Sequence, residues 1–178
     1  KISNSTNVEM VEYWSFCDSF KEQKNDKGEE YYLKNLRSLL DSAVEYRMIS
    51  DVPFGAFLSG GVDSSVITSI MSKNSSTPIK TYSIGFKEKG YNEFEYANII
   101  ASKFKTDHHE IVMNGDDYME TMDELISYKD APLSVPNEVP LYLMCKELKK
   151  DITVVLSGEG ADEIFGGYGS IFRSTDDY

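Results

Sequence analysis

Only two cysteines occur among the 178 residues, Cys17 and Cys145, and they lie in unrelated contexts. This scarcity gives no cysteine-based metal spacing and predicts two plain thiols in a reducing compartment. No apolar run approaches the roughly 20 residues of a membrane span. The first ten residues, KISNSTNVEM, contain no apolar core of a secretory signal. The sequence therefore predicts a cytoplasmic protein without a membrane partner.

Positive charge is also scarce, since 18 lysines and arginines stand against 30 aspartates and glutamates, for a net charge of −12. Nucleic-acid-binding domains are usually basic, so a nucleic-acid partner is not expected. An acidic chain can still bind a polyphosphate, but it needs a metal ion or local backbone amides to do so. The apolar content of 40% predicts a soluble globular domain with one sizeable core.

Strand-like and helix-like segments alternate from residue 29 onwards. The predicted helices are 29–50, 64–73, 93–104, 116–128 and 140–149, and the predicted strands are 54–58, 80–86, 107–113 and 152–156. This order indicates an α/β fold, a mostly parallel doubly wound sheet with helices on both faces. In such sheets the ligand binds beyond the carboxyl ends of the strands. Residues 1–28 are polar and are predicted to be a tether that precedes one domain over residues 29–178.

The stretch AFLSGGVDSSVITSI joins a predicted strand to a predicted helix. Gly60 and Gly61 allow a sharp turn and a close approach of the backbone to a ligand. Amides at the start of a helix bind phosphate. Three hydroxyl side chains add donors: Ser59, Ser64 and Ser65. No lysine follows the glycines, so this is not a Walker A loop, and the glycine spacing does not match a Rossmann fingerprint. We therefore predict an anion cradle of another kind.

Asp63 is the unusual residue of this corner, because a carboxylate repels phosphate unless a cation lies between them. Mg²⁺ bound by one or two carboxylates and by phosphate oxygens removes this conflict. A second corner, SGEGADE, follows the last predicted strand and offers Asp162 as the second carboxylate. The structural alternatives are that Asp63 caps the helix that follows, and that Asp162 and Glu163 only favour a helix dipole.

Residues 59–64, SGGVDS, resemble the SGGxDS pyrophosphate loop of the ATP pyrophosphatases. Residues 51–55, DVPFG, and 156–168, LSGEGADEIFGGY, resemble the synthetase domain of glutamine-dependent asparagine synthetase. The similarity runs from about residue 30 to residue 173. It implies a fold of the PP-loop type, similar to the adenine nucleotide alpha hydrolases, and ATP and Mg²⁺ as the groups that bind.

The resemblance also implies roles for single residues. Asp63 and Asp162 would bind the magnesium ion of the leaving pyrophosphate. Leu58 and Ile84 would flank the adenine base, and the backbone of Ser157 and Gly158 would read it. The phosphate loop itself supplies Ser59, Gly60, Gly61, Asp63, Ser64 and Ser65.

The chemistry that the resemblance implies is the formation of asparagine. The side-chain carboxylate of aspartate attacks the α-phosphorus of ATP, pyrophosphate leaves, and ammonia then displaces AMP from the aspartyl-adenylate. Glu159 is the candidate base that takes a proton from the attacking ammonia. Asp63 and Asp162 act with it through the metal.

The expected partners are aspartate, ATP and glutamine-derived ammonia, together with an N-terminal glutaminase domain. Because the sequence begins at Lys1 and ends at Tyr178, we expect a fragment that lacks this domain and a downstream basic residue near the pyrophosphate. Such a fragment is expected to be incomplete by itself. A homodimer is compatible with these expectations.

One segment departs from the family pattern and leaves the acceptor open. Residues 134–140, SVPNEVP, stand where better-known asparagine synthetases carry an arginine-containing stretch near the aspartate site. Asn137 and Glu138 therefore leave two further interpretations beside aspartate amidation. One is the same adenylation chemistry on another carboxylate, as in an asparagine synthetase-like amidotransferase or a β-lactam synthetase. The other is a non-catalytic nucleotide-binding remnant.

His108 and His109 resemble a metal site, since Glu110 follows them directly. Adjacent residues on a strand point to opposite faces of the sheet, so the two imidazoles are not expected to share one metal ion. We predict structural roles for both.

Overall fold

The computed structural model describes residues 10–15, 17, 25–88 and 92–168. The chain divides into two compact units, Lys1–Ser38 and Leu39–Tyr178. The helix α2, Glu29–Met48, begins in the first unit and ends in the second. Much of the predicted tether over residues 1–28 lies outside the described residues.

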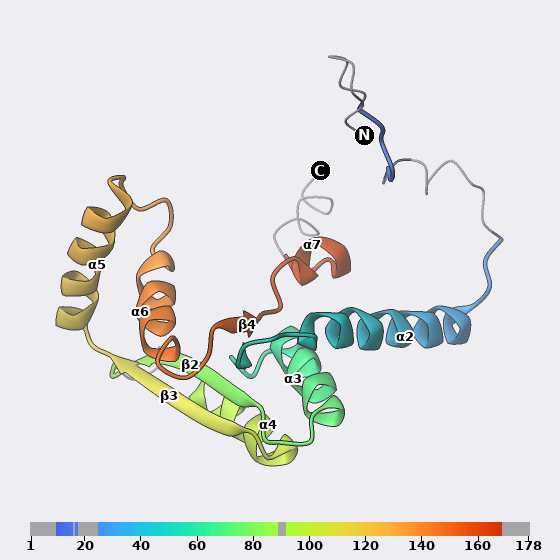
Figure 1. Ribbon diagram of the computed structural model, residues 1–178, viewed down its shortest axis with the longest axis horizontal. Helices are drawn as coiled ribbons and strands as arrows, with labels where there is room; N and C mark the ends of the chain where they lie inside the picture. Colours follow the sequence, from blue (N-terminus) through green and yellow to red (C-terminus); the bar gives the residue numbers. More distant parts are fainter. Residues whose placement is uncertain (1–9, 16, 18–24, 89–91, 169–178) are drawn as a thin grey trace, which may run out of the picture. The chain divides into compact units, whose positions relative to one another are not determined.

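One four-stranded parallel sheet forms the centre of the second unit (Figure 1). Its strands are β1 (Phe54–Phe57), β2 (Lys80–Phe86), β3 (Asp107–Met113) and β4 (Val154–Leu156), in the order β3-β2-β1-β4. All three neighbouring pairs are parallel. The chain runs outward from β1 to β3 and then returns to the other side of β1. The carboxyl ends of β1 and β4 therefore flank a topological switch point, where ligands bind in open parallel sheets.

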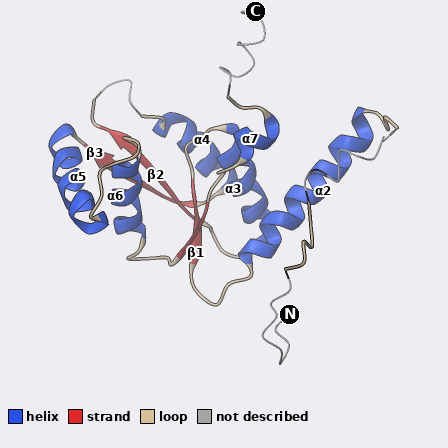
Figure 2. Ribbon diagram, turned by 90° about the horizontal axis from the view of Figure 1, so that it is seen from above, coloured by secondary structure: helices blue, strands red, loops and turns tan. Residues whose placement is uncertain are grey.

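Helices cover both faces of the sheet (Figure 2). On one side lie α3 (Val62–Asn74) and α4 (Phe94–Phe104), and on the other lie α5 (Gly115–Lys129) and α6 (Glu138–Leu148), which pack against each other. A short helix, α7 (Ala161–Phe165), follows β4. Every parallel connection crosses over through at least one helix, so that helices are available to cover both faces of the sheet.

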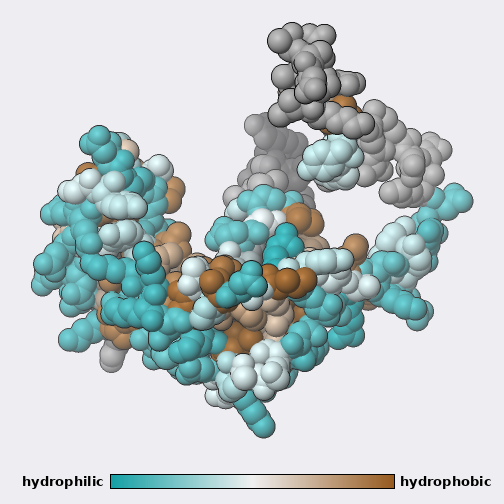
Figure 3. All heavy atoms as spheres, in the orientation of Figure 1, coloured by the Kyte–Doolittle hydropathy of each residue, from teal (hydrophilic) through white to brown (hydrophobic). Residues whose placement is uncertain are grey.

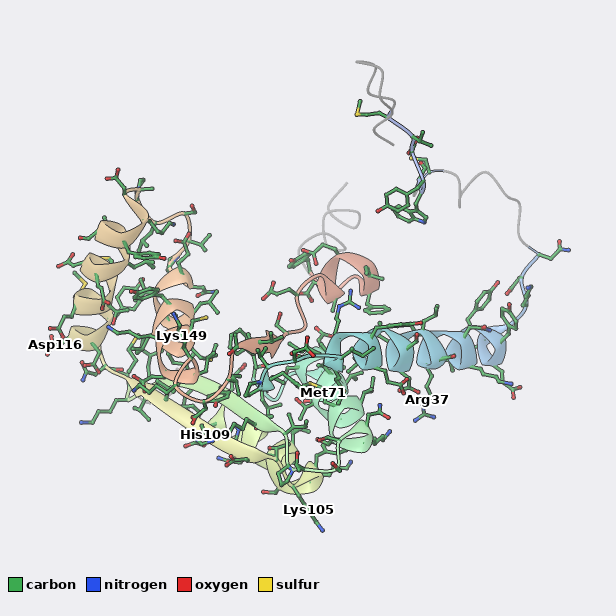
Figure 4. All side chains as sticks on the ribbon, in the orientation of Figure 1. Arg37, Met71, Lys105, His109, Asp116 and Lys149 are labelled. Atoms are coloured by element: carbon green, nitrogen blue, oxygen red, sulfur yellow. The ribbon has the colours of Figure 1, made fainter. Side chains whose placement is uncertain are left out.

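Side chains that alternate along the strands form the two layers of core. Toward α3, Ala56 packs against Ile70 and Met71 in a cluster that also contains Val44 of α2. Met71, which Figure 4 labels on α3, is fully buried. Toward α6, Tyr82 packs in a second cluster, whose other buried members are Met144, Leu148 and Ile152.

The predicted alternation of strands and helices is confirmed, and the strands 80–86 and 107–113 have the predicted bounds. Two helices begin two residues earlier than predicted. α3 begins at Val62, because Gly61 serves as its N-cap and the polar first turn carries no apolar periodicity. α6 begins at Glu138, since Pro140 lies in the first turn, where a missing N–H leaves no hydrogen bond unmade. The strand predicted over 152–156 is shorter, Val154–Leu156.

Hydrophilic side chains cover the outer surface of α5, and hydrophobic ones appear near the centre of the view, where the sheet lies (Figure 3). Within residues 10–15, 17, 25–88 and 92–168, no helix is both long and apolar enough to cross a membrane.

Candidate active site

The loop after β1 is held to β2 at its first residue. The Leu58 amide donates to the Tyr82 carbonyl over 2.9 Å, and the Ser83 hydroxyl donates to the Leu58 carbonyl. Leu58 itself is buried against Ala97 and Ala101 of α4. These contacts fix the point where the chain leaves the sheet, so the glycines that follow start from a rigid base.

Gly60 is the position in this loop that only glycine can occupy. Its φ of +85° lies in the left-handed region that side chains rarely adopt. A β-carbon there would stand 2.5 Å from the Tyr96 β-carbon and 2.6 Å from the Ala97 nitrogen. The loop therefore lies directly against the first turn of α4. The close approach explains why the sequence places a glycine at this point.

The three serines of the loop brace it through their hydroxyl groups. Ser59 Oγ and Ser64 Oγ are 3.0 Å apart, and the Gly61 amide donates to Ser59 Oγ over 3.2 Å. Ser65 Oγ donates to the Gly61 carbonyl over 2.6 Å. Since a hydroxyl carries one proton, Ser65 has its donor engaged within the loop and can offer a ligand only its lone pairs.

Asp63 is the second residue of α3, not its cap. The N-cap is Gly61, and no side chain makes a capping hydrogen bond there. The capping interpretation of Asp63 is therefore wrong. A helix without a capping side chain leaves its first-turn amides available to an anion. The half-buried Asp63 carboxylate lies within this same turn.

The loop after β4 meets the loop after β1. A β-carbon on Gly158 would stand 2.9 Å from the Asp63 β-carbon and 3.5 Å from the Ser64 nitrogen. Gly158 therefore packs against the first turn of α3. The two corners, about a hundred residues apart in the sequence, form one continuous surface at the switch point of the sheet.

The second loop is held by its own backbone around Asp162. The amides of Gly166 and Gly167 donate to the Asp162 carbonyl over 2.9 and 3.0 Å. Gly167 also approaches the Asp162 carboxylate so closely that a β-carbon would collide with it. Glu163 accepts a 2.8 Å hydrogen bond from the Tyr168 hydroxyl, and this bond lowers the pKa of Glu163. Glu159 is exposed to solvent.

A cleft of about 390 Å³ opens beyond the carboxyl ends of β1 and β2. Both apolar residues predicted to flank a base, Leu58 and Ile84, line it, and so does Ser59. Ser157 and Gly158 are not among its lining residues; Gly158 lies instead at the α3 turn. The remaining lining residues are Phe57, Tyr82, Ser83, Asn92, Glu93, Phe94 and Met144.

Most of these lining residues were not predicted as site residues from the sequence. Phe57 is the last residue of β1, so its place at the carboxyl end of that strand could have put it among the predicted site residues. Met144 reaches the cleft from α6, far along the chain, and no local pattern signals it. Glu93 begins the predicted helix 93–104, a position typical of a helix cap, but α4 has no side-chain capping hydrogen bond.

The two adjacent histidines point to opposite faces of the sheet, as predicted. His108 Nδ1 lies 2.9 Å from Thr81 Oγ1, and burial lowers the pKa of this imidazole. His109, which Figure 4 labels on β3, stacks on the Tyr82 ring with centroids 5.1 Å apart. Burial, followed by the nearby Asp151 carboxylate, raises the pKa of Tyr82 to about 12. Both imidazoles are packed into the sheet rather than paired at one metal site.

Glu138, in the segment that departs from the family pattern, is engaged in local structure. Its carboxylate forms an ion pair with Lys129 and accepts the Ser134 amide over 3.0 Å. The Lys129 hydrogen bond, helped by the Ser134 amide, lowers the pKa of Glu138. These contacts tie the start of α6 to the end of α5 and close the loop between them.

The donor set of the two loops fits a magnesium ion. Mg²⁺ prefers oxygen ligands and is usually held by one or two carboxylates together with substrate phosphates. Among the described residues, no group of three or more His, Cys, Asp or Glu side chains is placed to hold a metal. Asp63 and Asp162 are the carboxylates that the two loops would offer, and the contact of Gly158 with Asp63 brings these loops together.

The comparisons with known proteins agree with this architecture. The family model described as asparagine synthase matches residues 35–177. Glutamine-hydrolyzing asparagine synthetase 1 of Bacillus subtilis (strain 168) is 41% identical over 145 residues, 82% of this chain and 23% of the relative. Putative glutamine-hydrolyzing asparagine synthetase 2 of Methanocaldococcus jannaschii is 43% identical over 157 residues, 88% of this chain and 30% of the relative. The chain thus spans less than a third of the length of these relatives.

The solved structure of NMN synthetase from Francisella tularensis is similar in fold, with a TM-score of 0.50 and 17% identity over 80% of this chain and 59% of that chain. At this identity the likeness shows the fold alone, and it agrees with the predicted α/β architecture built on a parallel sheet. The matched family model covers both glycine corners and the sheet between them. The chain belongs to the asparagine synthase family.

Proposed function

We propose that this chain is the ATP-binding synthetase domain of an enzyme that adenylates the side-chain carboxylate of aspartate and amidates it to give asparagine. The observation that carries the proposal is the contact of the two loops. Gly158 packs against Asp63 beside a cleft lined by Leu58 and Ile84. An anion-binding turn, two acidic residues and an apolar slot are the features that a nucleoside triphosphate requires.

In the first step the carboxylate oxygen of aspartate attacks the α-phosphorus of ATP. The bond from this phosphorus to the bridging oxygen breaks, and pyrophosphate leaves. The first-turn amides of α3 face the charge that develops on the leaving group. Asp63 and Asp162 would hold magnesium, which when bound neutralises phosphate charge. Leu58 and Ile84 would hold the base, so that the reacting atoms stay in line.

In the second step ammonia attacks the carbonyl carbon of the aspartyl-adenylate and AMP leaves. The attacking nitrogen loses a proton, and Glu159 is the residue that we propose accepts it. Glu159 follows Gly158 directly in the loop after β4 and is exposed, so its carboxylate is free of the core. We propose that ammonia comes from glutamine, through a glutaminase domain elsewhere in the same full-length protein.

The test is exchange of labelled pyrophosphate into ATP by the full-length protein, across a panel of carboxylic acids that includes aspartate and glutamate. Exchange that depends on aspartate is expected. Exchange with another acid but not with aspartate would support the adenylation reaction and contradict aspartate as its acceptor. Absence of exchange with every acid would contradict the enzymatic proposal and favour a nucleotide-binding remnant.

A further inference from the structure

Glu93 places a carboxylate at the nucleotide cleft that the reaction steps above do not use. It lines the same cleft as Leu58, Ser59 and Ile84, and it is exposed. It lies at the N-cap position of α4, but its side chain makes no capping hydrogen bond. The requirements of the helix therefore do not explain why a glutamate occupies this position.

The backbone on both sides of Glu93 is packed against the end of β2. A β-carbon on Gly85 would stand 2.6 Å from the Asn92 β-carbon and 2.8 Å from Phe94 Cζ. Asn92 Nδ2 also donates to the Phe86 carbonyl over 3.2 Å. The Glu93 carbonyl accepts the amides of Tyr96 and Ala97 over 3.0 and 3.1 Å. Glu93 is therefore presented to the cleft from a fixed backbone, which lowers the entropy lost when it binds a ligand.

Glu93 is connected both to the phosphate loop and to the apolar residues assigned to the base. Tyr96 and Ala97, one turn further along α4, touch Gly60 of the phosphate loop. The cleft that Glu93 lines is also lined by Leu58 and Ile84, the apolar residues assigned to the base. In a nucleotide the ribose joins the base to the phosphates, so the sugar is the part expected near Glu93.

The chemistry of a carboxylate selects the same part of the nucleotide. An ionised glutamate only accepts hydrogen bonds and repels phosphate oxygens. The ribose of ATP offers two adjacent hydroxyl donors, which match the two carboxylate oxygens. We propose that Glu93 accepts hydrogen bonds from the ribose hydroxyls and so selects ribonucleotides over deoxyribonucleotides. This inference rests on the proposed ATP site and deepens it.

The test is direct binding, measured by calorimetry on the full-length protein with magnesium present. The ligands are ATP, 2′-deoxyATP, 3′-deoxyATP and ITP, and the variants are Glu93→Ala and Glu93→Gln. Wild type is expected to bind ATP about ten- to a hundredfold more tightly than at least one deoxynucleotide, the range of a charge-assisted hydrogen bond. Glu93→Ala is expected to weaken the binding of ATP by a similar factor. Its affinity for that deoxynucleotide is expected to stay within about twofold of the wild-type value. Glu93→Gln, which keeps the shape but not the charge, should lie between.

The matched control is Glu95→Gln, an exposed carboxylate in the first turn of the same helix that does not line the cleft. It is expected to change none of the four affinities. An equal loss for ATP and both deoxynucleotides in Glu93→Ala would overturn the inference. A changed ratio of ATP to ITP would show that Glu93 reads the base, and would overturn it too.

The binding assay separates this inference from the proposed reaction. Ribose selectivity that depends on Glu93, together with no pyrophosphate exchange, would overturn the proposed reaction and support the inference. Pyrophosphate exchange by wild type, together with unchanged ribose selectivity in Glu93→Ala, would support the proposed reaction and overturn the inference. Absence of ATP binding by wild type would overturn both.

Discussion

Gly158 and Asp63 lie so close that a β-carbon on the glycine would stand 2.9 Å from the β-carbon of the aspartate. The two residues come from loops that follow neighbouring strands, β4 and β1. Contact at this distance leaves no room for any side chain between the loops. The positions of the Asp63 carboxylate and of the loop that carries Asp162 are therefore mechanically linked.

The first prediction follows from this contact. Gly158→Ala should lower the rate of pyrophosphate exchange by about a hundredfold, because displacement of a catalytic loop by about 1 Å has an effect of this size. The structure gives no left-handed φ for Gly158, so the substitution adds a clash without backbone strain. Its cost in the free energy of unfolding should be about 1–3 kcal/mol. Exchange kinetics and thermal unfolding of the full-length protein measure the two effects.

Gly115→Ala is the matched control for this change. Gly115 is the first residue of α5, its φ is not in the left-handed region, and a β-carbon there would meet nothing within 4 Å. Exchange should be unaffected. Equal exchange in Gly158→Ala and wild type would show that the loops do not act together.

The second prediction concerns Gly60, which combines a left-handed φ of +85° with a clash against Tyr96 and Ala97. Gly60→Ala should lower the free energy of unfolding by about 2–5 kcal/mol, the sum of backbone strain and overpacking. Gly28→Ala separates the two causes, since Gly28 has a φ of +80° and open space around it. Gly28→Ala should lower the free energy of unfolding by about 1–2 kcal/mol. An equal loss in both variants, from thermal or denaturant unfolding, would mean that contact with α4 contributes nothing.

The sequence was sufficient to predict the sheet, because buried parallel strands are short β-branched runs between helices of regular period. The family resemblance implied that Leu58 and Ile84 flank one base, and both residues line one cleft. The sequence could not predict that Gly158 contacts Asp63 and is not among the residues that line the cleft. The approach of two loops depends on how far each strand extends, and β4 ends after only three residues.

The same limit applies to Glu93 and Glu138. A glutamate before a helix has the same local signature whether it caps the helix, lines a cleft or pairs with a distant lysine. Only the tertiary packing of Asn92 and Phe94 on Gly85, and of α5 on α6, distinguishes these cases.

The third prediction concerns the pH dependence of stability. The folded-state pKa of Glu138 is lowered, chiefly by its hydrogen bond with Lys129. A carboxyl with a lowered pKa stabilises the fold above its ordinary pKa of 4.5, and this contribution is lost as the pH falls through the lowered value. Glu138→Gln should therefore lower the thermal midpoint at pH 7, and the difference from wild type should shrink below about pH 4.

Glu147→Gln serves as the control for this effect, because the Glu147–Lys150 ion pair is exposed and lies within three residues of sequence. Such surface pairs contribute little to stability. If the difference in thermal midpoint between Glu138→Gln and wild type stays constant from pH 3 to pH 7, the stabilising role assigned to the Glu138 carboxylate is contradicted.

The fourth prediction separates a metal-binding role of Asp63 from a helix-dipole role. Asp63 is the second residue of α3, and Asp116 is the second residue of α5, so both carboxylates meet the same dipole. Asp63→Asn and Asp116→Asn should therefore change stability alike, by about 0.3–1 kcal/mol. Only Asp63→Asn should reduce pyrophosphate exchange, by about a hundredfold or more, and raise the magnesium concentration needed for half-maximal exchange.

Asp162→Asn extends this test to the second loop. If both carboxylates hold one ion, either single change removes most of the effect, and the double variant should be little worse than each single one. Multiplied losses in the double variant would mean that the two carboxylates act independently. Equal exchange in Asp63→Asn and Asp116→Asn would reduce Asp63 to a partner of the helix dipole, and the anion would then be held by the first-turn amides of α3 without a bridging cation.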